Sequence, residues 1–197
     1  ARFIIMNTEG VKLLGKTPNP EDMSLADIWI QGKLHSLIQS IEKNITNYRI
    51  DLVANSLYDF VWHDYCNWYL ELSKSILRDD DQYKPQQKQA TQLNLLYTLG
   101  ATLKCLHPII PFITEELFQT INPDQKKSSI MVDNYPNSKD FIVNQPVLDQ
   151  MDWLITFVVS IRQIRSEMNI SPKVKIPVLL QDASDEDLEL IKESKTY

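Results

Sequence analysis

Glycine is scarce in this sequence. Only four of the 197 residues are glycine, and they lie apart from one another at Gly10, Gly15, Gly32 and Gly100. Phosphate-binding loops of the nucleoside-triphosphate and dinucleotide kinds need several glycines close together, because the backbone itself must approach the phosphates. The sequence therefore predicts no nucleotide-binding or cofactor-binding site in this chain.

Cysteine is scarcer still. Cys66 and Cys105 lie in segments that read as separate helices, without the paired spacings of a secreted disulfide scaffold. We predict that both are reduced thiols in the core. A structural zinc site needs four ligands, and the pair His63 and Cys66, three residues apart, has no matching second pair. We therefore expect no metal site.

Long apolar runs are missing as well. No segment approaches the roughly 18 to 20 apolar residues of a membrane span, so we expect no membrane partner. The opening residues ARFIIMNTEG have the features of neither a signal peptide nor a transit peptide, which favours the cytoplasm. Residues 1–7 are apolar enough to begin inside folded structure, so we expect that Ala1 was cut from a longer chain.

Positive charge is in short supply, since 20 Lys and Arg face 26 Asp and Glu, for a net charge of -6. This balance argues against binding DNA or any nucleic acid through bulk electrostatics. Residues 155–180 are a local exception, because Glu167 is their only acid while they hold four cations: Arg162, Arg165, Lys173 and Lys175. Six acids follow in residues 182–193, so a nucleic-acid surface would have to exclude that tail.

What the sequence has in quantity is helical periodicity. Ser24 and Asp27 form a capping-box pattern, and apolar residues follow at spacings of three and four, which predicts a helix over residues 24–46. Similar patterns predict a mainly α protein with a helical bundle over residues 20–168. Its further helices are expected over residues 51–77, from Pro85 to about His107, over residues 112–121 and from Val147 onward.

The rest of the chain is expected to be less regular. Residues 1–19 are predicted to be a connection, and residues 129–136 either a short strand or an extended segment over the bundle. The alternation of lysine and apolar residues after Pro172 predicts a strand over residues 173–180, and Ser184 is placed to open a short acidic helix. Residues 169–197 should thus form a small mixed α/β segment.

The segment richest in aromatic residues is YDFVWHDYCNWYLELSK, residues 58–74, in which six of seventeen positions hold Tyr, Trp or Phe. At the period of an α-helix these residues and their neighbours form two apolar stripes. One stripe contains Leu57, Val61, Trp68 and Leu72, and the other contains Tyr58, Trp62, Tyr65 and Tyr69. A helix with two apolar faces either packs between neighbours or presents one face to a ligand.

Such a face suits RNA, because bases in an open loop stack on aromatic rings and are read at their edges by polar side chains. Trp62, His63 and Tyr65 are our stacking candidates, although packing in the core is an equal alternative for Trp62 and Tyr65 and the favoured one for Trp68 and Tyr69. The edge-reading and phosphate-binding candidates are Arg49, Asp59, Asn67, Arg162, Arg165, Lys173 and Lys175.

The role of Arg165 has two alternatives. Arg165 continues the apolar stripe of its helix, so it either caps the helix C-terminus or reaches toward phosphate.

No catalytic group stands out in the sequence. The adjacent Glu115 and Glu116 point in different directions on a helix and cannot converge on one substrate. The residues alone therefore predict a non-catalytic chain.

Several segments together carry a family resemblance: ARFIIMNTEG, SLADIWIQGKL, the aromatic segment, LHPIIPFITEELF and IRSEMNISPKVKIPVLL. They resemble the anticodon-binding region of the valyl-type class I aminoacyl-tRNA synthetases over nearly the whole chain. LHPIIPFITEELF is common to the valine, isoleucine, leucine and methionine members, whereas FVW, CNWYLE and IRSEMNISP favour the valyl type. The sequence departs from the family pattern in having Tyr65 for Phe and Asn67 for Asp.

The resemblance implies an all-helical bundle that holds the anticodon stem-loop of a valine-accepting tRNA, and a monomer. The parent enzyme would attach valine to its tRNA using ATP and magnesium, but the HIGH and KMSKS signatures of catalysis do not occur in this chain. The loop would meet the exposed side of the aromatic helix, Arg49 and the cations of residues 162–175. An isoleucyl-type domain and a helical scaffold for a protein partner remain the alternatives.

Overall fold

The structure is a computed structural model that describes residues 1–11, 17–78, 82–122, 129–171, 173–181 and 183–193. The chain divides into two compact units, Ala1–Asn144 and Gln145–Tyr197, and each is described here by itself. The described residues form helices and contain no strand, which confirms the mainly α class. The expected domain limits at residues 1–19, 20–168 and 169–197 stay a prediction.

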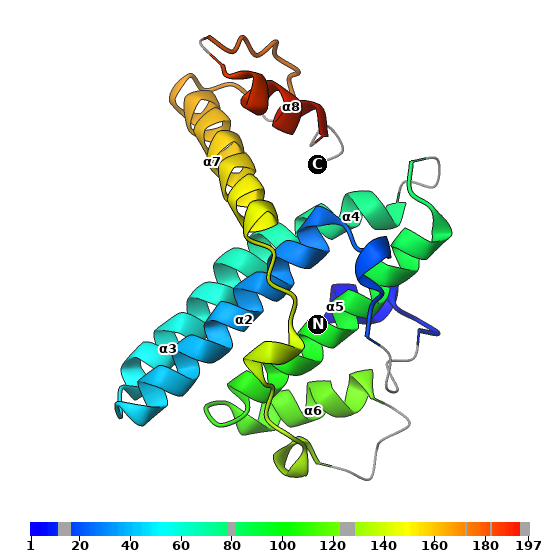
Figure 1. Cartoon of the computed structure of the whole chain (residues 1–197), viewed down its shortest axis with the longest axis vertical. Helices are drawn as coiled ribbons and strands as arrows, with labels where there is room; N and C mark the ends of the chain where they lie inside the picture. Colours follow the sequence, from blue (N-terminus) through cyan, green and yellow to red (C-terminus); the bar gives the residue numbers. More distant parts are fainter. Residues whose placement is uncertain (12–16, 79–81, 123–128, 172, 182, 194–197) are drawn as a thin grey trace. The chain divides into compact units, whose positions relative to one another are not determined.

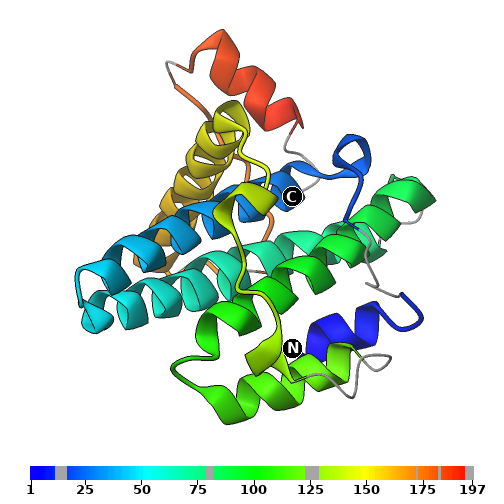
Figure 2. The same cartoon turned by 60° about the horizontal axis from the view of Figure 1, so that its bottom comes forward.

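The first unit is a bundle of long helices (Figure 1). Helix α2 lies beside α3 and η2, and η2 continues into α4 without a break. Helix α5 packs against α2 and α4, and both α1 and α6 pack on α5 (Figures 1 and 2). The bounds are α1 Arg2–Asn7, η1 Pro20–Asp22, α2 Leu25–Thr46, α3 Ile50–Asp59, η2 Phe60–Tyr69, α4 Leu70–Arg78, α5 Pro85–Leu106 and α6 Pro111–Ile121.

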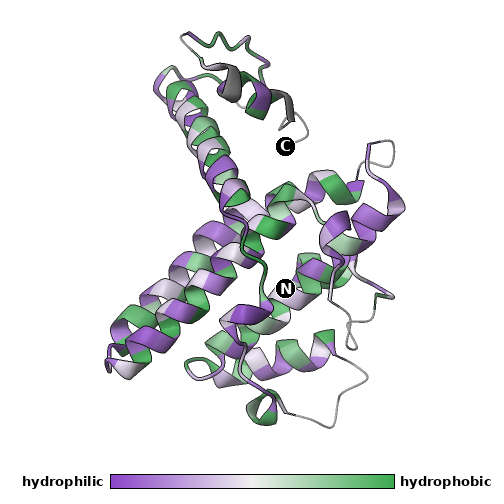
Figure 3. Cartoon of the chain, viewed as in Figure 1, coloured by the Kyte–Doolittle hydropathy of each residue, from purple (hydrophilic) through white to green (hydrophobic). Residues whose placement is uncertain are grey.

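The helix ends follow from local chemistry. At the start of α2, Ser24 Oγ accepts a hydrogen bond from the Asp27 amide at 3.1 Å, and the Asp27 carboxylate accepts one from the Ser24 amide at 3.0 Å. This confirms the predicted capping box. Pro85 and Pro111 open α5 and α6, where the missing N–H costs nothing. Apolar and polar residues alternate along α2 and α3, as expected of helices with one buried face (Figure 3).

The segments α3, η2 and α4 form one long continuous helix, which was predicted over residues 51–77. The middle of this long second helix is a π-helix, η2, rather than an α-helix. The Leu70 amide, for example, donates to the carbonyl of Tyr65, five residues earlier instead of four. The wider turn changes which side chains share a face. Tyr65 and Tyr69 are buried, whereas Tyr58 and Trp62 are 60% and 54% exposed, so the predicted single stripe of these four residues is wrong.

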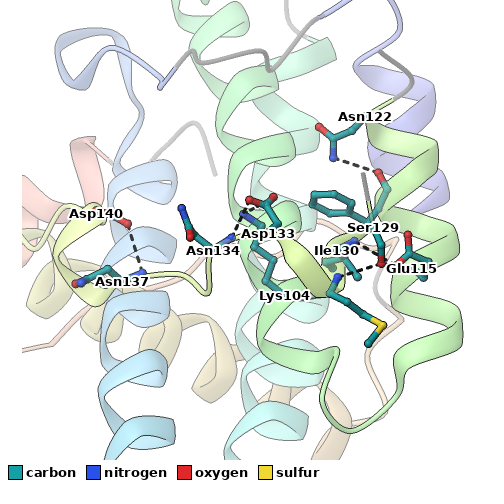
Figure 4. A network of polar contacts seen from close by, with 11 residues as sticks. Lys104, Glu115, Asn122, Ser129, Ile130, Asp133, Asn134, Asn137 and Asp140 are labelled. Carbon is teal, nitrogen blue, oxygen red and sulfur yellow. Dashed lines mark hydrogen bonds and ion pairs between the residues drawn. The ribbon is translucent and has the colours of Figure 1, made fainter. Parts of the chain in front are cut away.

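Residues 129–144, which we call the strap, cross the bundle in an extended path with two short 3-10 turns, η4 (Ile130–Val132) and η5 (Ser138–Asp140). One end is tied to α6, because the Glu115 carboxylate accepts from Ser129 Oγ at 2.7 Å and from the Ile130 amide at 3.2 Å (Figure 4). Asp133 pairs with Lys104 of α5 at 3.0 Å. The extended alternative for this segment is the correct one.

The second unit contains α7 (Gln145–Glu167) and α8 (Asp185–Glu193). The predicted acidic helix after Ser184 is confirmed, and Ser184 Oγ accepts from the Asp187 amide at 3.1 Å. The predicted strand over residues 173–180 is wrong, because these residues follow an irregular path and the described chain contains no strand with which they could pair. Without that strand, the expected mixed α/β segment is helical and irregular in its described part.

Candidate nucleic-acid interface

One side of the long second helix presents a cluster of exposed side chains, which we call the aromatic face: Tyr58, Asp59, Trp62, His63 and Asn67. The rings of Tyr58 and Trp62 lie nearly parallel, with centroids 6.3 Å apart and planes 11° apart. The His63 ring stands edge-on to Tyr58, with centroids 6.4 Å apart and planes 82° apart. The face therefore offers flat, solvent-accessible rings beside polar groups.

The opposite side of η2 is anchored in the core. The Tyr65 hydroxyl donates to the Leu95 carbonyl of α5 at 3.1 Å, and its ring packs on Tyr69 with centroids 5.5 Å apart. Burial raises the pKa of both tyrosine hydroxyls. Tyr65 is only 4% exposed, so no ring face is open to a base, and its predicted stacking role is contradicted.

The polar groups of the aromatic face are open to a ligand. The side chains of Asp59 and Asn67 are exposed and make no hydrogen bond to another residue in the described part of the chain. Beside them Asp64 pairs with Lys33 of α2 at 3.4 Å. Cys66 is exposed, and its predicted place in the core is wrong, although both cysteines are free thiols.

Arg49 lies at the start of α3, away from the aromatic face. Tyr58, the nearest member of the face, follows it by nine residues of helix, or roughly 14 Å at 1.5 Å per residue, and Trp62 follows it by thirteen residues. The Arg49 guanidinium forms a two-point pair with Asp51, with its Nε and Nη2 atoms at 2.9 and 2.7 Å from the carboxylate oxygens. The pair lowers the pKa of Asp51 to about 2. The structure does not bring Arg49 to the aromatic face, and Asp51 would compete with any phosphate.

The other predicted cations belong to the second unit. Arg162, Lys173 and Lys175 are exposed. Arg165 Nη2 donates to the Ser171 and Val174 carbonyls, both at 2.6 Å, so this guanidinium holds the loop after α7. That geometry favours a structural role for Arg165 over a phosphate contact. A single site that combines these cations with the aromatic face stays a prediction.

The described residues form neither a metal-ligand cluster nor a membrane-spanning helix. No group of three or more His, Cys, Asp or Glu side chains gathers there in a way that could hold a metal ion. No helix in the same residues is both long enough and apolar enough to cross a membrane. The aromatic face is a candidate interface of the first unit, and its chemistry suits a flat ligand with polar edges.

The sequence had placed Tyr58 on an apolar stripe but not among the candidate site residues. Its signal was the four-residue spacing to Trp62, which on a helix puts two rings side by side. The exposed and parallel placement of these rings could not be read from that spacing, because the same spacing serves core packing equally well.

Comparison with known protein families defines the class. Residues 27–180 match the family described as the anticodon-binding domain of tRNA ligase. The match covers most of the chain, from the first turn of α2 to the residues that follow α7. The chain therefore belongs to the family of tRNA-ligase anticodon-binding domains.

The individual relatives narrow the comparison further. The chain is similar to the valine-tRNA ligases of Coxiella burnetii, at 38% identity over 199 residues, and Legionella pneumophila strain Lens, at 40% over 188. It is 41% identical over 188 residues to that of Neisseria meningitidis serogroup B. These alignments cover 100%, 94% and 93% of this chain but only 21%, 20% and 20% of the relatives. The chain thus spans about a fifth of the length of these relatives. The identities confirm the predicted valyl-type resemblance.

Proposed function

We propose that this chain is the part of a valine-tRNA ligase that binds the anticodon stem-loop of a valine-accepting tRNA. The observation that carries the proposal is the parallel, exposed pair of rings at Tyr58 and Trp62, on a helix of the family's anticodon-binding domain. The open polar groups of Asp59 and Asn67 on the same face support it.

The chemistry of the face suggests how a base would be held. An unpaired base stacks on the plane of Trp62 or Tyr58, which is sequence-tolerant because every base has a π-face. Recognition then comes from the edges: the Asn67 amide both donates and accepts, whereas the ionised Asp59 carboxylate only accepts and so favours a base that presents an amino group. His63 supplies a further ring beside Tyr58.

The rest of the proposal concerns the parent enzyme. It would join valine to its tRNA with ATP and magnesium, in the cytoplasm and as a monomer, while this chain contributes recognition and no catalytic group. The names of the relatives and the share of their length that the chain spans support this division of labour. Arg162, Lys173 and Lys175 would contact phosphates, which fix orientation without reading sequence.

Replacing Trp62 by alanine tests the stacking role. Because the ring is exposed, we expect the free energy of unfolding to change by less than about 0.5 kcal/mol. Affinity for a valine-type anticodon stem-loop should fall by roughly 1 to 3 kcal/mol, the value of one stacked base. Both quantities can be measured on the same preparation, by urea unfolding and by fluorescence titration.

The matched control is Tyr48→Ala. Tyr48 is another exposed aromatic residue of the first unit, 91% accessible, but it lies in the turn between α2 and α3. Its removal should leave stem-loop affinity unchanged. Wild-type affinity in a folded Trp62→Ala variant would remove Trp62 from the site.

A further inference from the structure

Behind the aromatic face lies a buried polar cluster, which we call the Asp27 cluster: Ser24, Asp27, Tyr69, Thr91 and Asn94. Asp27, Tyr69, Thr91 and Asn94 are each 0% exposed. One oxygen of the Asp27 carboxylate accepts from the Tyr69 hydroxyl at 2.7 Å and from the Asn94 amide at 3.2 Å. The other accepts from the Thr91 hydroxyl and the Ser24 hydroxyl, each at 2.7 Å.

The cluster joins three elements at one point. Asp27 comes from α2, Tyr69 is the last residue of the π-helix η2, and Asn94 comes from α5. The Asn94 amide also donates to the Tyr69 hydroxyl oxygen at 2.8 Å, so that hydroxyl is fixed from both sides. A buried carboxylate is tolerated only when its hydrogen bonds are made, which leaves this arrangement little freedom.

The π-helix needs such support. Wide turns of this kind are rare and are found mostly as short insertions in α-helices, frequently at functional sites. Returning the segment to α-helical hydrogen bonding would shift the register by one residue, a rotation of about 100° around the helix axis. Trp62, His63 and Asn67 would then point in different directions relative to the core residue Tyr69.

We propose that Tyr69, held by Asp27 and Asn94, is a positioning residue that fixes the register of η2 and so orients the aromatic face toward RNA. This inference rests on the proposed function. Tyr69 is fully buried and does not touch the ligand, so it acts through the exposed residues of its own helix.

The test is Tyr69→Phe, which removes one hydroxyl and keeps the ring. We expect affinity for the valine-type stem-loop to fall at least about tenfold, because the lost hydrogen bond no longer favours the register that binds RNA, and the preference over a loop with a changed anticodon to shrink. Amide hydrogen exchange within residues 60–69 should become faster, because the segment is no longer held to α2 and α5.

Thr102→Val is the matched control. It also removes one buried hydroxyl, but that hydroxyl donates only to the Thr98 carbonyl within α5, at 2.7 Å. It should lower stability without changing affinity, anticodon preference or exchange in η2. Should Tyr69→Phe fail to fold, Thr91→Val takes its place, since it removes one donor to the same carboxylate and no atom of η2.

The outcomes separate the two proposals. Unchanged anticodon preference in folded Tyr69→Phe, or equal loss of affinity in Tyr69→Phe and Thr102→Val, would overturn the positioning role. If the wild-type chain binds no stem-loop, the proposed function fails, and exchange in η2 alone decides the register: unchanged exchange in Tyr69→Phe overturns it, and faster exchange confined to η2 supports it.

Discussion

Trp62 and Tyr65 stand three residues apart on one helix, yet they have opposite surroundings. Trp62 is 54% exposed on the aromatic face, whereas Tyr65 is 4% exposed and bonded to the Leu95 carbonyl. Removing the first should therefore change binding, and removing the second should change stability. Single substitutions can separate the two roles.

We expect Tyr65→Ala to lower the free energy of unfolding by about 3 to 5 kcal/mol, because it leaves a large cavity and removes the hydrogen bond to the Leu95 carbonyl. The midpoint of urea unfolding measures this loss. Tyr58→Ala removes an exposed ring from the same helix, 60% accessible, and should cost far less. Similar midpoints for the two variants would contradict the burial assigned to Tyr65.

The sequence could predict part of the site at this scale. Asp59, Trp62, His63 and Asn67 are exposed, as the candidates for a ligand-binding face need to be, although core packing was an equal alternative for Trp62. The placement of Tyr65 was wrong because an α-helical period was assumed through a π-helical segment. Nothing in the local residue types announces that wider turn.

At the scale of elements, the helices were predictable because their ends carry chemical signals. Ser24 caps α2, and Pro85 and Pro111 occupy the first positions of α5 and α6. The strand predicted over residues 173–180 does not form, because the alternation of residue types shows only that the two faces of a segment differ. A strand also needs a neighbour to pair with, and that is a property of the fold rather than of the segment.

The strap gives a prediction for an element. Glu115 accepts hydrogen bonds from Ser129 and the Ile130 amide, and these bonds hold its pKa below the ordinary value. Glu115→Ala should release this end of the strap, so protease cleavage within residues 129–141 should become faster. Limited proteolysis with mass spectrometry measures it.

Glu116→Ala is the matched control for the strap, because Glu116 is the exposed neighbour on α6. Its removal should leave cleavage of the strap at the wild-type rate. Equal cleavage rates in Glu115→Ala and the wild type would show that the Glu115 contacts do not secure the strap.

For the whole molecule, charge limits how RNA can bind. The net charge of -6 repels phosphate at long range, so we propose that affinity comes from local contacts on the aromatic face and from the few cations of the second unit. Family membership follows from the sequence pattern along the full chain, whereas the base contacts do not, because they depend on exposure that only the fold decides.

Buried hydroxyl and thiol groups give the whole chain a pH dependence. Burial raises the pKa of Cys105 from 9.0 to about 11, and it also raises the pKa of Tyr65 and Tyr69 above 10.0. Above pH 9 the unfolded chain loses protons that the folded chain keeps, so stability falls as pH rises. We expect a loss of about 2 to 4 kcal/mol between pH 8 and pH 10.5, measured by urea unfolding.

The variant Cys105→Ala checks the origin of this alkaline loss. It should be less stable at pH 8, because a buried side chain is shortened, but its further loss between pH 9 and pH 10.5 should be smaller than that of the wild type. A stability that stays constant from pH 8 to pH 10.5 in the wild-type chain would contradict the burial of these groups.

The most direct test of the central claim is a titration of the purified chain with a valine-type anticodon stem-loop and an isoleucine-type control, at two salt concentrations. We predict tighter binding of the valine-type loop, weakened as salt rises because phosphate contacts contribute. Equal binding of both loops would contradict valine-type recognition, and binding of neither loop by the folded chain would contradict anticodon recognition altogether.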